Sequence, residues 1–289
     1  MVHRITTEAA GPGEATAIVW RRNLAAPTKR KEPASSDQAE PDDERMLRAR
    51  RERRLRRTAG FVVIVLAFVA VAIAISRGGG AGPPKPGSPQ ARRDVAAVTG
   101  TLRGIPQSGV VLGSPRAPVT VTEYADLECA FCRGFALGAE RRLISREVKN
   151  GAVKLRYRSL CSATCTGPLG RAGFAGQQAA AYAAGLQNQG WYYIQLFYEE
   201  QGSEGTGYVT PRYLADLARQ IPGLDYGRWS SDKDLNALRR KVVSDEQIAR
   251  AQNLNQTPTI VVQGPRGRAK PFVGEPSYAI LQAAISSVR

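Results

Sequence analysis

Residues 119–135 read VTVTEYADLECAFCRGF, and this stretch decides the fold. The β-branched run at 119–122 predicts a strand, and the apolar segment after Cys129 predicts a helix. Cys129 and Cys132 have the spacing C-x-x-C at the start of that helix, where backbone N–H groups and the helix dipole favour a thiolate. The spacing also lets the two sulfurs close a small disulfide ring. The sequence therefore predicts a pair suited to thiol–disulfide exchange, although zinc sites use the same spacing.

The chain has 289 residues and a formal net charge of +16, which raises the question of a nucleic-acid partner. Much of the excess charge lies in the arginines of 48–57, directly before an apolar run, where membrane topology explains it. No zinc-finger, RNA-binding or helix-turn-helix pattern accompanies the charge, so we predict no nucleic-acid partner. The only histidine is His3, in the N-terminal tail. This excludes histidine-based metal sites and Cys–His catalysis in the folded part.

The N-terminal region is predicted to form a tail followed by a membrane anchor. Residues 1–57 lack sustained periodicity and predict a disordered basic cytoplasmic tail, with Met46 as an alternative start. Residues 58–76 contain an uncharged apolar run at the short end of the length that a transmembrane helix needs. A cleaved signal peptide is the alternative, but its A-x-A patterns lie inside the apolar run. We therefore expect a single-pass protein of the cell membrane, with its N-terminus cytoplasmic and its folded domain extracytoplasmic.

The rest of the chain is predicted to form a spacer followed by one folded domain. Residues 77–108 are expected to form a Gly/Pro-rich linker, and 109–289 the domain. Periodicity predicts, in order, the strand at 119–122, the C-x-x-C helix, a strand at 153–160, a helical block, strands at 259–262 and 271–274, and a helix at 278–288. This order is that of an α/β thioredoxin-like fold whose two halves are separated by a helical insertion at about 167–252.

The stretch 109–289 resembles the DsbA-like thioredoxin-fold family of thiol–disulfide oxidoreductases. The resemblance depends on APVTVTEYADLECAFC at 117–132, QTPT at 256–259 and GEP at 274–276. It implies an enzyme that needs no cofactor and exchanges disulfides with cysteines of exported proteins. It also implies a membrane or small-molecule redox partner. N-terminally anchored members are common among the exported bacterial proteins of this type, which agrees with the predicted anchor.

The resemblance assigns roles by position. Cys129 would be the exposed nucleophile and Cys132 the resolving thiol. Pro258 would be a cis-proline that shapes the loop so that the backbone of Thr257 pairs with an extended substrate; an ordinary trans proline is the alternative. Glu123 lies on the same strand face as the buried valines and would assist proton transfer to the buried thiol, with a solvated glutamate as the alternative.

Two features depart from the strongest oxidants of that family. Ala130 and Phe131 separate the cysteines and are expected to contact substrate, but neither supplies the charge or donor of the histidine that strong oxidants often have there. We therefore expect a less oxidising potential. The second feature is the pair Cys161 and Cys165, predicted to form a structural disulfide in an oxidising compartment. A second redox pair and a four-cysteine zinc site are the alternatives.

Two functional alternatives remain open from the sequence. The first is a reductase that keeps specific exported thiols reduced. The second is a redox-inactive module that binds a client and whose cysteine pairs are structural. Asp126 and Glu128 are predicted to be turn and helix-start residues without a chemical role.

Overall fold

The computed structural model of the protein describes residues 82–289. The predicted tail, the predicted membrane segment and the beginning of the linker lie outside the described residues. Among the described helices, none is both long and apolar enough to cross a membrane.

A sheet of seven strands, counted over residues 82–289, is built around β3 (Val119–Ala125). On one side β3 pairs in parallel with β4 (Val153–Ser159), and on the other it pairs antiparallel with β5 (Thr259–Gly264). The short strands that complete the sheet are β1 (Gln107–Ser108), β2 (Val111–Leu112), β6 (Gly267–Arg268) and β7 (Phe272–Val273). Six of the seven β3 residues are buried because β3 is central and both of its faces are covered. The segment that follows β3 therefore leaves the sheet at the end of a central strand, between the ends of its neighbours.

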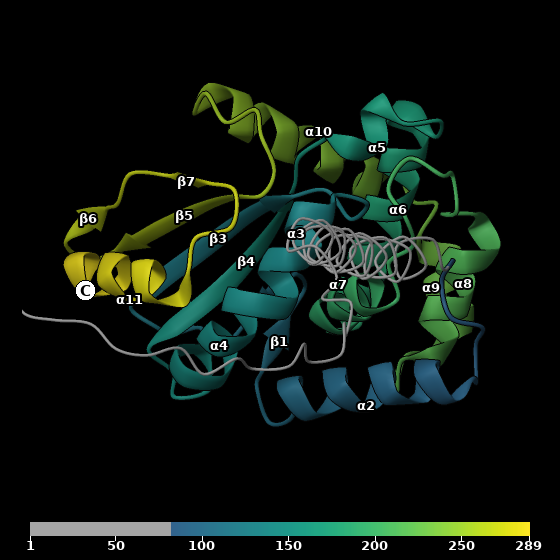
Figure 1. Ribbon diagram of the computed structural model, residues 1–289, viewed down its shortest axis with the longest axis horizontal. Coiled ribbons are helices and arrows are strands. Elements are labelled where there is room, and N and C mark those ends of the chain that lie inside the picture. Colours follow the sequence, from purple (N-terminus) through teal and green to yellow (C-terminus); the bar gives the residue numbers. More distant parts are fainter. Residues whose placement is uncertain (1–81) are drawn as a thin grey trace, which may run out of the picture. The chain divides into compact units, whose positions relative to one another are not determined.

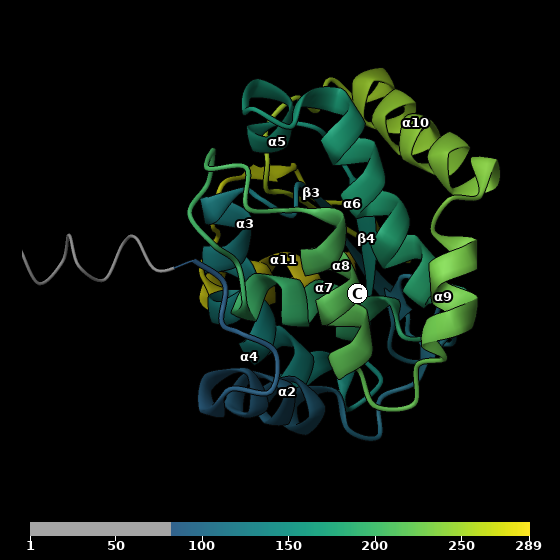
Figure 2. The same ribbon diagram turned by 90° about the vertical axis from the view of Figure 1, so that its right-hand side faces the viewer.

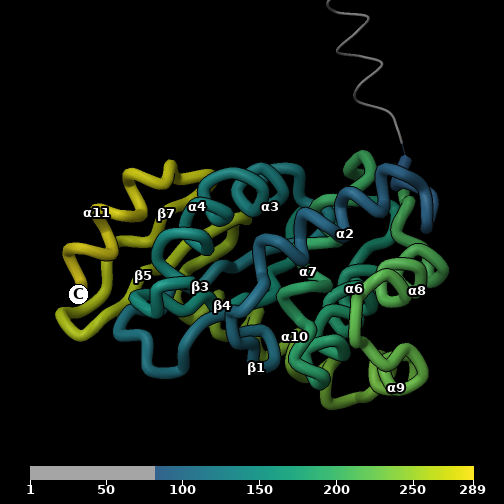
Figure 3. Tube along the Cα trace, turned by 90° about the horizontal axis from the view of Figure 1, so that it is seen from below, coloured from purple at the N-terminus to yellow at the C-terminus, as the bar shows by residue number. Residues whose placement is uncertain are grey.

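Helices cover both faces of the sheet (Figures 1 and 3). One face carries α11 (Tyr278–Val288) and a continuous helical run from 130 to 148. That run consists of α3 (Ala130–Phe135), a π-helical turn η1 (Ala136–Glu140), α4 (Arg141–Leu143) and a second π-helical turn η2 (Ile144–Val148). The other face carries α10 (Asn236–Ala251), which packs on a smaller apolar cluster that includes Tyr124 and Val261.

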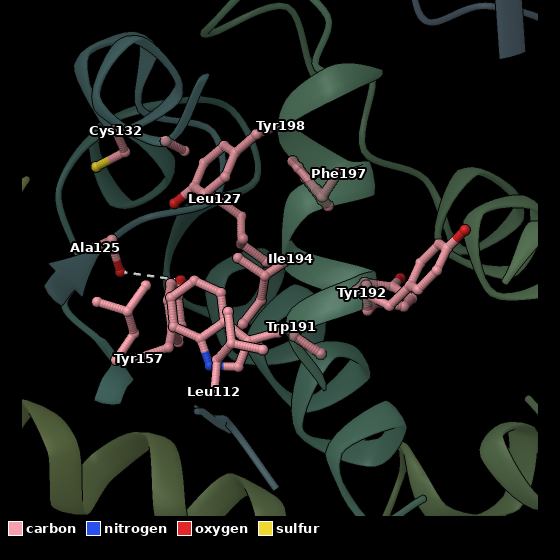
Figure 4. Packing of buried hydrophobic residues seen from close by; sticks show 14 of the residues in the cluster. Leu112, Ala125, Leu127, Cys132, Tyr157, Trp191, Tyr192, Ile194, Phe197 and Tyr198 are labelled. Carbon is pink, nitrogen blue, oxygen red and sulfur yellow. Dashed lines mark hydrogen bonds between the residues drawn. The ribbon is translucent and has the colours of Figure 1, made fainter. Parts of the chain in front are cut away.

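The predicted helical insertion lies between β4 and β5 (Figure 2). Its helices are α5 (Ala163–Thr166), α6 (Gly170–Gly185), α7 (Gly190–Glu199), α8 (Pro211–Gln220), α9 (Tyr226–Asp232) and α10. Helix α7 is rich in aromatic residues and buried along almost its whole length. Figure 4 shows Trp191, Ile194 and Tyr198 of α7 in one cluster with Tyr157 of β4. The insertion therefore shares a core with the sheet.

The linker prediction is wrong for its second half. Helix α2 (Pro89–Leu102) occupies residues predicted as a spacer and packs along α7 (Figure 3). Ser88 caps it, Pro89 suits its first turn, and Val98 and Leu102 are buried. Its apolar face is narrow and its mean hydropathy is low, so the composition resembled that of a linker.

The sequence analysis also missed two smaller features. The hairpin of β1 and β2 was assigned to the linker and to the start of the domain, because strands of two residues give no alternation to detect. Within the helical block the sequence pattern predicts a last helix at about 232–251, but α10 begins four residues later, and α9, just before it, was not predicted as a separate helix. The predicted strand at 153–160 and the predicted helix at 278–288 are confirmed, with β4 ending at Ser159.

Candidate active site

Cys129 follows the short turn after β3 and is the N-cap residue of α3, at the start of the helical run. The turn before it is closed by a hydrogen bond from its own N–H to the Asp126 carbonyl, and its carbonyl accepts from the N–H of Arg133. Cys132 is completely buried one turn further into the helix. Both cysteines are unpaired in the structure. Cys129 was predicted to be exposed, but only 5% of its surface is, because the helix start and the neighbouring loops enclose it. The order strand, turn, helix thus places the Cys129 sulfur at a helix N-terminus, where it lines a cavity, and the Cys132 sulfur beneath it.

The two thiols differ sharply in acidity. The pKa of Cys129 is lowered to about 6, first by a hydrogen bond from the Cys132 thiol and then by the Thr257 hydroxyl and the N–H groups of Cys132 and Phe131. These interactions outweigh burial, which acts in the opposite direction. Burial, and then the hydrogen bond and the charge of Cys129, raise the pKa of Cys132. A lowered pKa suits a thiol to act as nucleophile and leaving group, and in this pair only Cys129 has one, whereas Cys132 is a protonated thiol near neutral pH.

The loop before β5 faces Cys129. The Thr257–Pro258 peptide bond is cis, and the Cys129 sulfur lies 3.7 Å from the Thr257 carbonyl oxygen. The Thr257 hydroxyl also contacts that of Ser162, which follows β4. The pairing of Tyr124 with Thr259 holds this loop beside the end of β3. The predicted cis-proline is thus confirmed as a geometry, although its role in substrate pairing is a prediction.

Glu123 is buried on the β3 face that covers the active-site helix, as predicted, with 2% of its surface exposed. Its partner is Glu140, which the sequence analysis did not identify. Burial raises the pKa of both carboxyls, to about 7 for Glu140, and the proximity of Glu140 raises that of Glu123 further. Neither Glu123 oxygen meets a donor from another residue, whereas Gln195 of α7 donates to Glu140 at 2.7 Å. Two neighbouring buried carboxyls disfavour a second negative charge, so the raised pKa values keep a proton on this pair close to Cys132.

Asp126 was predicted to be a turn residue, and in the structure its carboxylate also connects two segments of the chain by hydrogen bonds. Its buried carboxylate accepts hydrogen bonds from the N–H groups of Ser162, Thr164 and Glu128, at 2.9 to 3.1 Å, and from the Thr164 hydroxyl. These bonds fasten the segment after β4 to the turn before Cys129. Glu128 accepts from Gln177 of α6 at 3.1 Å and so joins the insertion to the same turn.

Cys161 and Cys165 form a disulfide with a Cα–Cα distance of 5.8 Å, in the segment that Asp126 holds. Over residues 82–289, no group of three or more His, Cys, Asp or Glu side chains is arranged to hold a metal ion. The disulfide is half-buried and faces the cavity in front of Cys129.

A cavity of about 700 Å³ opens in front of Cys129. Its lining comes from five parts of the chain: the helix start with Phe131, the disulfide segment, Glu204 of the loop after α7, the cis-proline loop with Thr257, and Val273 of β7. Phe131 and Val273 are 65% and 58% exposed, so two apolar side chains flank the reactive sulfur. Ala130 is exposed at the helix start, where its N–H donates to Glu204. Such a rim suits an extended, partly apolar polypeptide.

Three functional residues escaped prediction because their partners are distant in sequence. Glu140 stands in a helical stretch rich in arginine, so nothing local marks it as buried. Gln195 lies among aromatics, and Glu204 lies in a loop. The one available signal was the position of Glu140 eight residues after Cys132, inside a helix that was predicted correctly.

The comparisons with known proteins agree with this geometry. A model of the family described as thioredoxin matches residues 106–285. The probable disulfide bond formation protein D of Bacillus anthracis is 25% identical over 154 residues, which are 53% of this chain and 69% of that protein. The disulfide bond formation protein D of Bacillus subtilis is 25% identical over 175 residues, which are 57% of this chain and 72% of that protein.

Among solved structures, oxidised BdbD of Bacillus subtilis superposes with a TM-score of 0.53. The match covers 72% of this chain and 96% of that chain at 20% sequence identity, so it supports the fold alone. The family match extends over more than half of the chain and includes the whole site described above. The chain therefore belongs to the thioredoxin family, among its DsbA-like thiol–disulfide oxidoreductases.

Proposed function

We propose that this chain exchanges disulfides with cysteines of exported proteins through the Cys129–Cys132 pair, and that it works mainly as an oxidant. The observation that carries the proposal is the contrast between the two thiols. Cys129 is acidic and faces an open cavity beside the cis-proline loop, and Cys132 is buried and protonated beneath it. A structural cysteine pair has no need of this asymmetry.

The chemistry follows from that asymmetry. A substrate thiolate attacks the Cys129 sulfur of the oxidised pair, an intermolecular S–S bond forms, and Cys132 leaves. Because burial disfavours a charge on Cys132, it takes up a proton, which the Glu123–Glu140 pair supplies. A second substrate thiolate then attacks the substrate sulfur of the mixed disulfide and releases Cys129, whose low pKa makes it a good leaving group. Two electrons have passed from the substrate to the enzyme, and a membrane or small-molecule partner must reoxidise it.

Single substitutions of the two cysteines test the proposal. In the full chain, C129S abolishes oxidation of a peptide that contains two cysteines, because no mixed disulfide can form. C132S mixed with the disulfide form of the same peptide accumulates a mixed disulfide, visible as an added mass, because Cys129 attacks the peptide disulfide and the enzyme's own resolving thiol is missing. C161S/C165S, the matched control, retains exchange if that disulfide is structural, as we propose. If peptide oxidation persists in C129S, the function is not the one proposed.

The reductase alternative is separated by the potential of the pair. A pKa of about 6 for Cys129 lies between the roughly 3.5 of strongly oxidising DsbA and the roughly 7 of thioredoxin. We therefore expect a potential between about −120 and −270 mV. A value near about −120 mV would indicate an oxidase, and one near about −270 mV a reductase. Equilibration with glutathione buffers, followed by alkylation and peptide mass spectrometry, measures it for each cysteine pair.

Localisation is part of the proposal. The predicted membrane segment at 58–76 and the arginines before it would place the domain outside the cytoplasm in a single-pass protein of the cell membrane. Protease added to intact spheroplasts is expected to degrade the domain, and digestion only after lysis would contradict this arrangement.

A further inference from the structure

The loop between α7 and α8 crosses the start of the active-site helix (Figure 2). Gln201, near the start of this loop, donates to the carbonyl oxygens of Leu127 and Cys129 at 2.6 and 3.3 Å. Three residues later the Glu204 carboxylate accepts a hydrogen bond from the N–H of Ala130 at 3.0 Å. The helical insertion thus touches the residues on both sides of the reactive cysteine.

The same helix end also stabilises the Cys129 sulfur. The N–H groups of Phe131 and Cys132 lower the pKa of Cys129, and the N–H of Ala130 is taken by Glu204. Both Glu204 and Cys129 line the cavity in front of the helix. One helix N-terminus therefore serves two anions, the thiolate and the carboxylate, and its partial positive charge is shared between them.

No nearby cation compensates the Glu204 charge. In the part of the chain that the structure describes, no lysine or arginine lies within ion-pair distance of it. Arg133, one turn along the same helix, donates instead to the Tyr198 carbonyl at 2.9 Å. The other acidic side chains of this region, Asp126 and Glu128, accept hydrogen bonds from neighbouring donors and add to the negative potential. The Glu204 carboxylate thus stands at the helix start with the Ala130 N–H as its partner and without a neighbouring cation.

This rests on the proposed function, because only an exchanging pair passes between thiolate and disulfide. In the reduced protein the helix end faces two negative charges, and in the disulfide form it faces one. Glu204 therefore destabilises the reduced form and leaves the oxidised form untouched. We propose that Glu204 sets the redox equilibrium of the Cys129–Cys132 pair by competing with the thiolate for the helix N-terminus. It is a positioning residue that makes the protein a weaker oxidant.

The test is E204Q in the full chain, because glutamine keeps an oxygen for the Ala130 N–H and removes only the charge. Asp234→Asn is the matched control, since Asp234 is exposed, distant and alters the net charge equally. The redox equilibrium with glutathione is expected to shift about threefold to tenfold toward the dithiol in E204Q, that is, about 15 to 30 mV toward the oxidising side. Cys129 alkylation is expected to titrate at a lower pH. High salt reduces the difference from wild type, because the effect is one of charge.

The outcomes separate the two proposals. If the wild-type pair exchanges with glutathione and E204Q matches both wild type and D234N, the role of Glu204 is refuted and the proposed function stands. A shift that D234N shares, or one that high salt leaves unchanged, also refutes it. If the wild-type Cys129–Cys132 pair does not exchange at all, the proposed function fails and this inference fails with it.

Discussion

At the scale of single residues, the site depends on where protons reside. Cys132 and the two carboxyls of Glu123 and Glu140 are all buried, and all three hold protons at a pH where their exposed counterparts would be less protonated. Gln195 orients Glu140, and Glu140 in turn lies against Glu123. In the proposed exchange, where Cys132 is deprotonated and reprotonated, the carboxyl pair would supply the proton without water.

The carboxyl pair makes stability depend on pH. Because the folded-state pKa of both acids is raised, folding binds protons between the unfolded value near 4.5 and the folded value of about 7 for Glu140. The contribution of these protons to the free energy of unfolding is fully present below about pH 4.5. It is lost as the pH rises toward neutrality, which lowers the free energy of unfolding by on the order of 3 kcal/mol. E140Q is expected to flatten this decline, since it removes one acid and relieves the other. Urea unfolding of the reduced protein from pH 4.5 to 8 measures it.

Glu147→Gln is the control for that experiment, because Glu147 lies in the same helical run but is half-buried and bound by Tyr278. Equal pH slopes for E140Q and wild type would show that the pair does not share a proton.

Residue-scale prediction from sequence succeeded where chemistry is local and failed where it is not. The burial of Glu123 was expected from its strand face, and the cis geometry of Pro258 was implied by the family resemblance; both are confirmed. The C-x-x-C spacing correctly placed Cys129 and Cys132 at a helix start, and their catalytic roles stay predictions. Glu140 was not predicted, because its burial depends on α7 closing over it, and α7 comes from the insertion. Asp126 was underestimated for the same reason, since its donors lie in a segment after β4.

At the scale of elements, the segment that contains the Cys161–Cys165 disulfide is held mainly by one buried carboxylate. Helix α5 has only four residues and no side-chain cap, so its own hydrogen bonds stabilise it poorly. Asp126 supplies the missing acceptor for its first N–H groups. The position of this wall of the cavity is therefore set by the turn before Cys129.

Asp126→Ala is expected to lower the free energy of unfolding by about 2 to 4 kcal/mol, because it leaves several buried donors without an acceptor. It is also expected to speed reduction of the Cys161–Cys165 disulfide by dithiothreitol, since α5 loosens. Thr166→Ala is the control, because the exposed Thr166 hydroxyl bonds only to carbonyls of its own turn. An unchanged reduction rate in D126A would mean that other contacts hold the segment.

Element-scale prediction followed the length of each element. β4 and α11 are long enough for alternation or helical periodicity to be counted, and both were located correctly. The β1–β2 hairpin and α9 are too short for that, and they form because the sheet edge and α6 offer them surfaces. Tertiary contact, which no local window contains, decides such elements.

At the scale of the molecule, α2 extends the domain beyond the thioredoxin core. Ala91, Val98 and Leu102 are buried, and the Tyr192 hydroxyl of α7 donates to the Val95 carbonyl at 3.0 Å and contacts Thr99. The first helix of the described chain is thus anchored to the insertion.

Removal of α2 tests this arrangement. A fragment beginning at Lys85 keeps the Ser88 cap, and one beginning at Gly104 lacks the helix. We expect the shorter fragment to lose about 3 to 5 kcal/mol of unfolding free energy, because the apolar face of α7 beneath α2 becomes exposed. Chemical denaturation of both fragments measures the difference. Equal free energies of unfolding would show that α2 does not stabilise the domain and acts only as a spacer.

The placement of the insertion has a consequence for the order in which the protein is made. β4 and β5 both pair with β3, but the chain between them contains all the helices from α5 to α10. During synthesis from the N-terminus, all four cysteines leave the ribosome before Thr257, which lies 128 positions after Cys129. Four thiols allow three pairings. The Cys161–Cys165 disulfide of the structure and the proposed Cys129–Cys132 pairing close the shortest loops, so loop-closure entropy favours this combination before the sheet exists to enforce it.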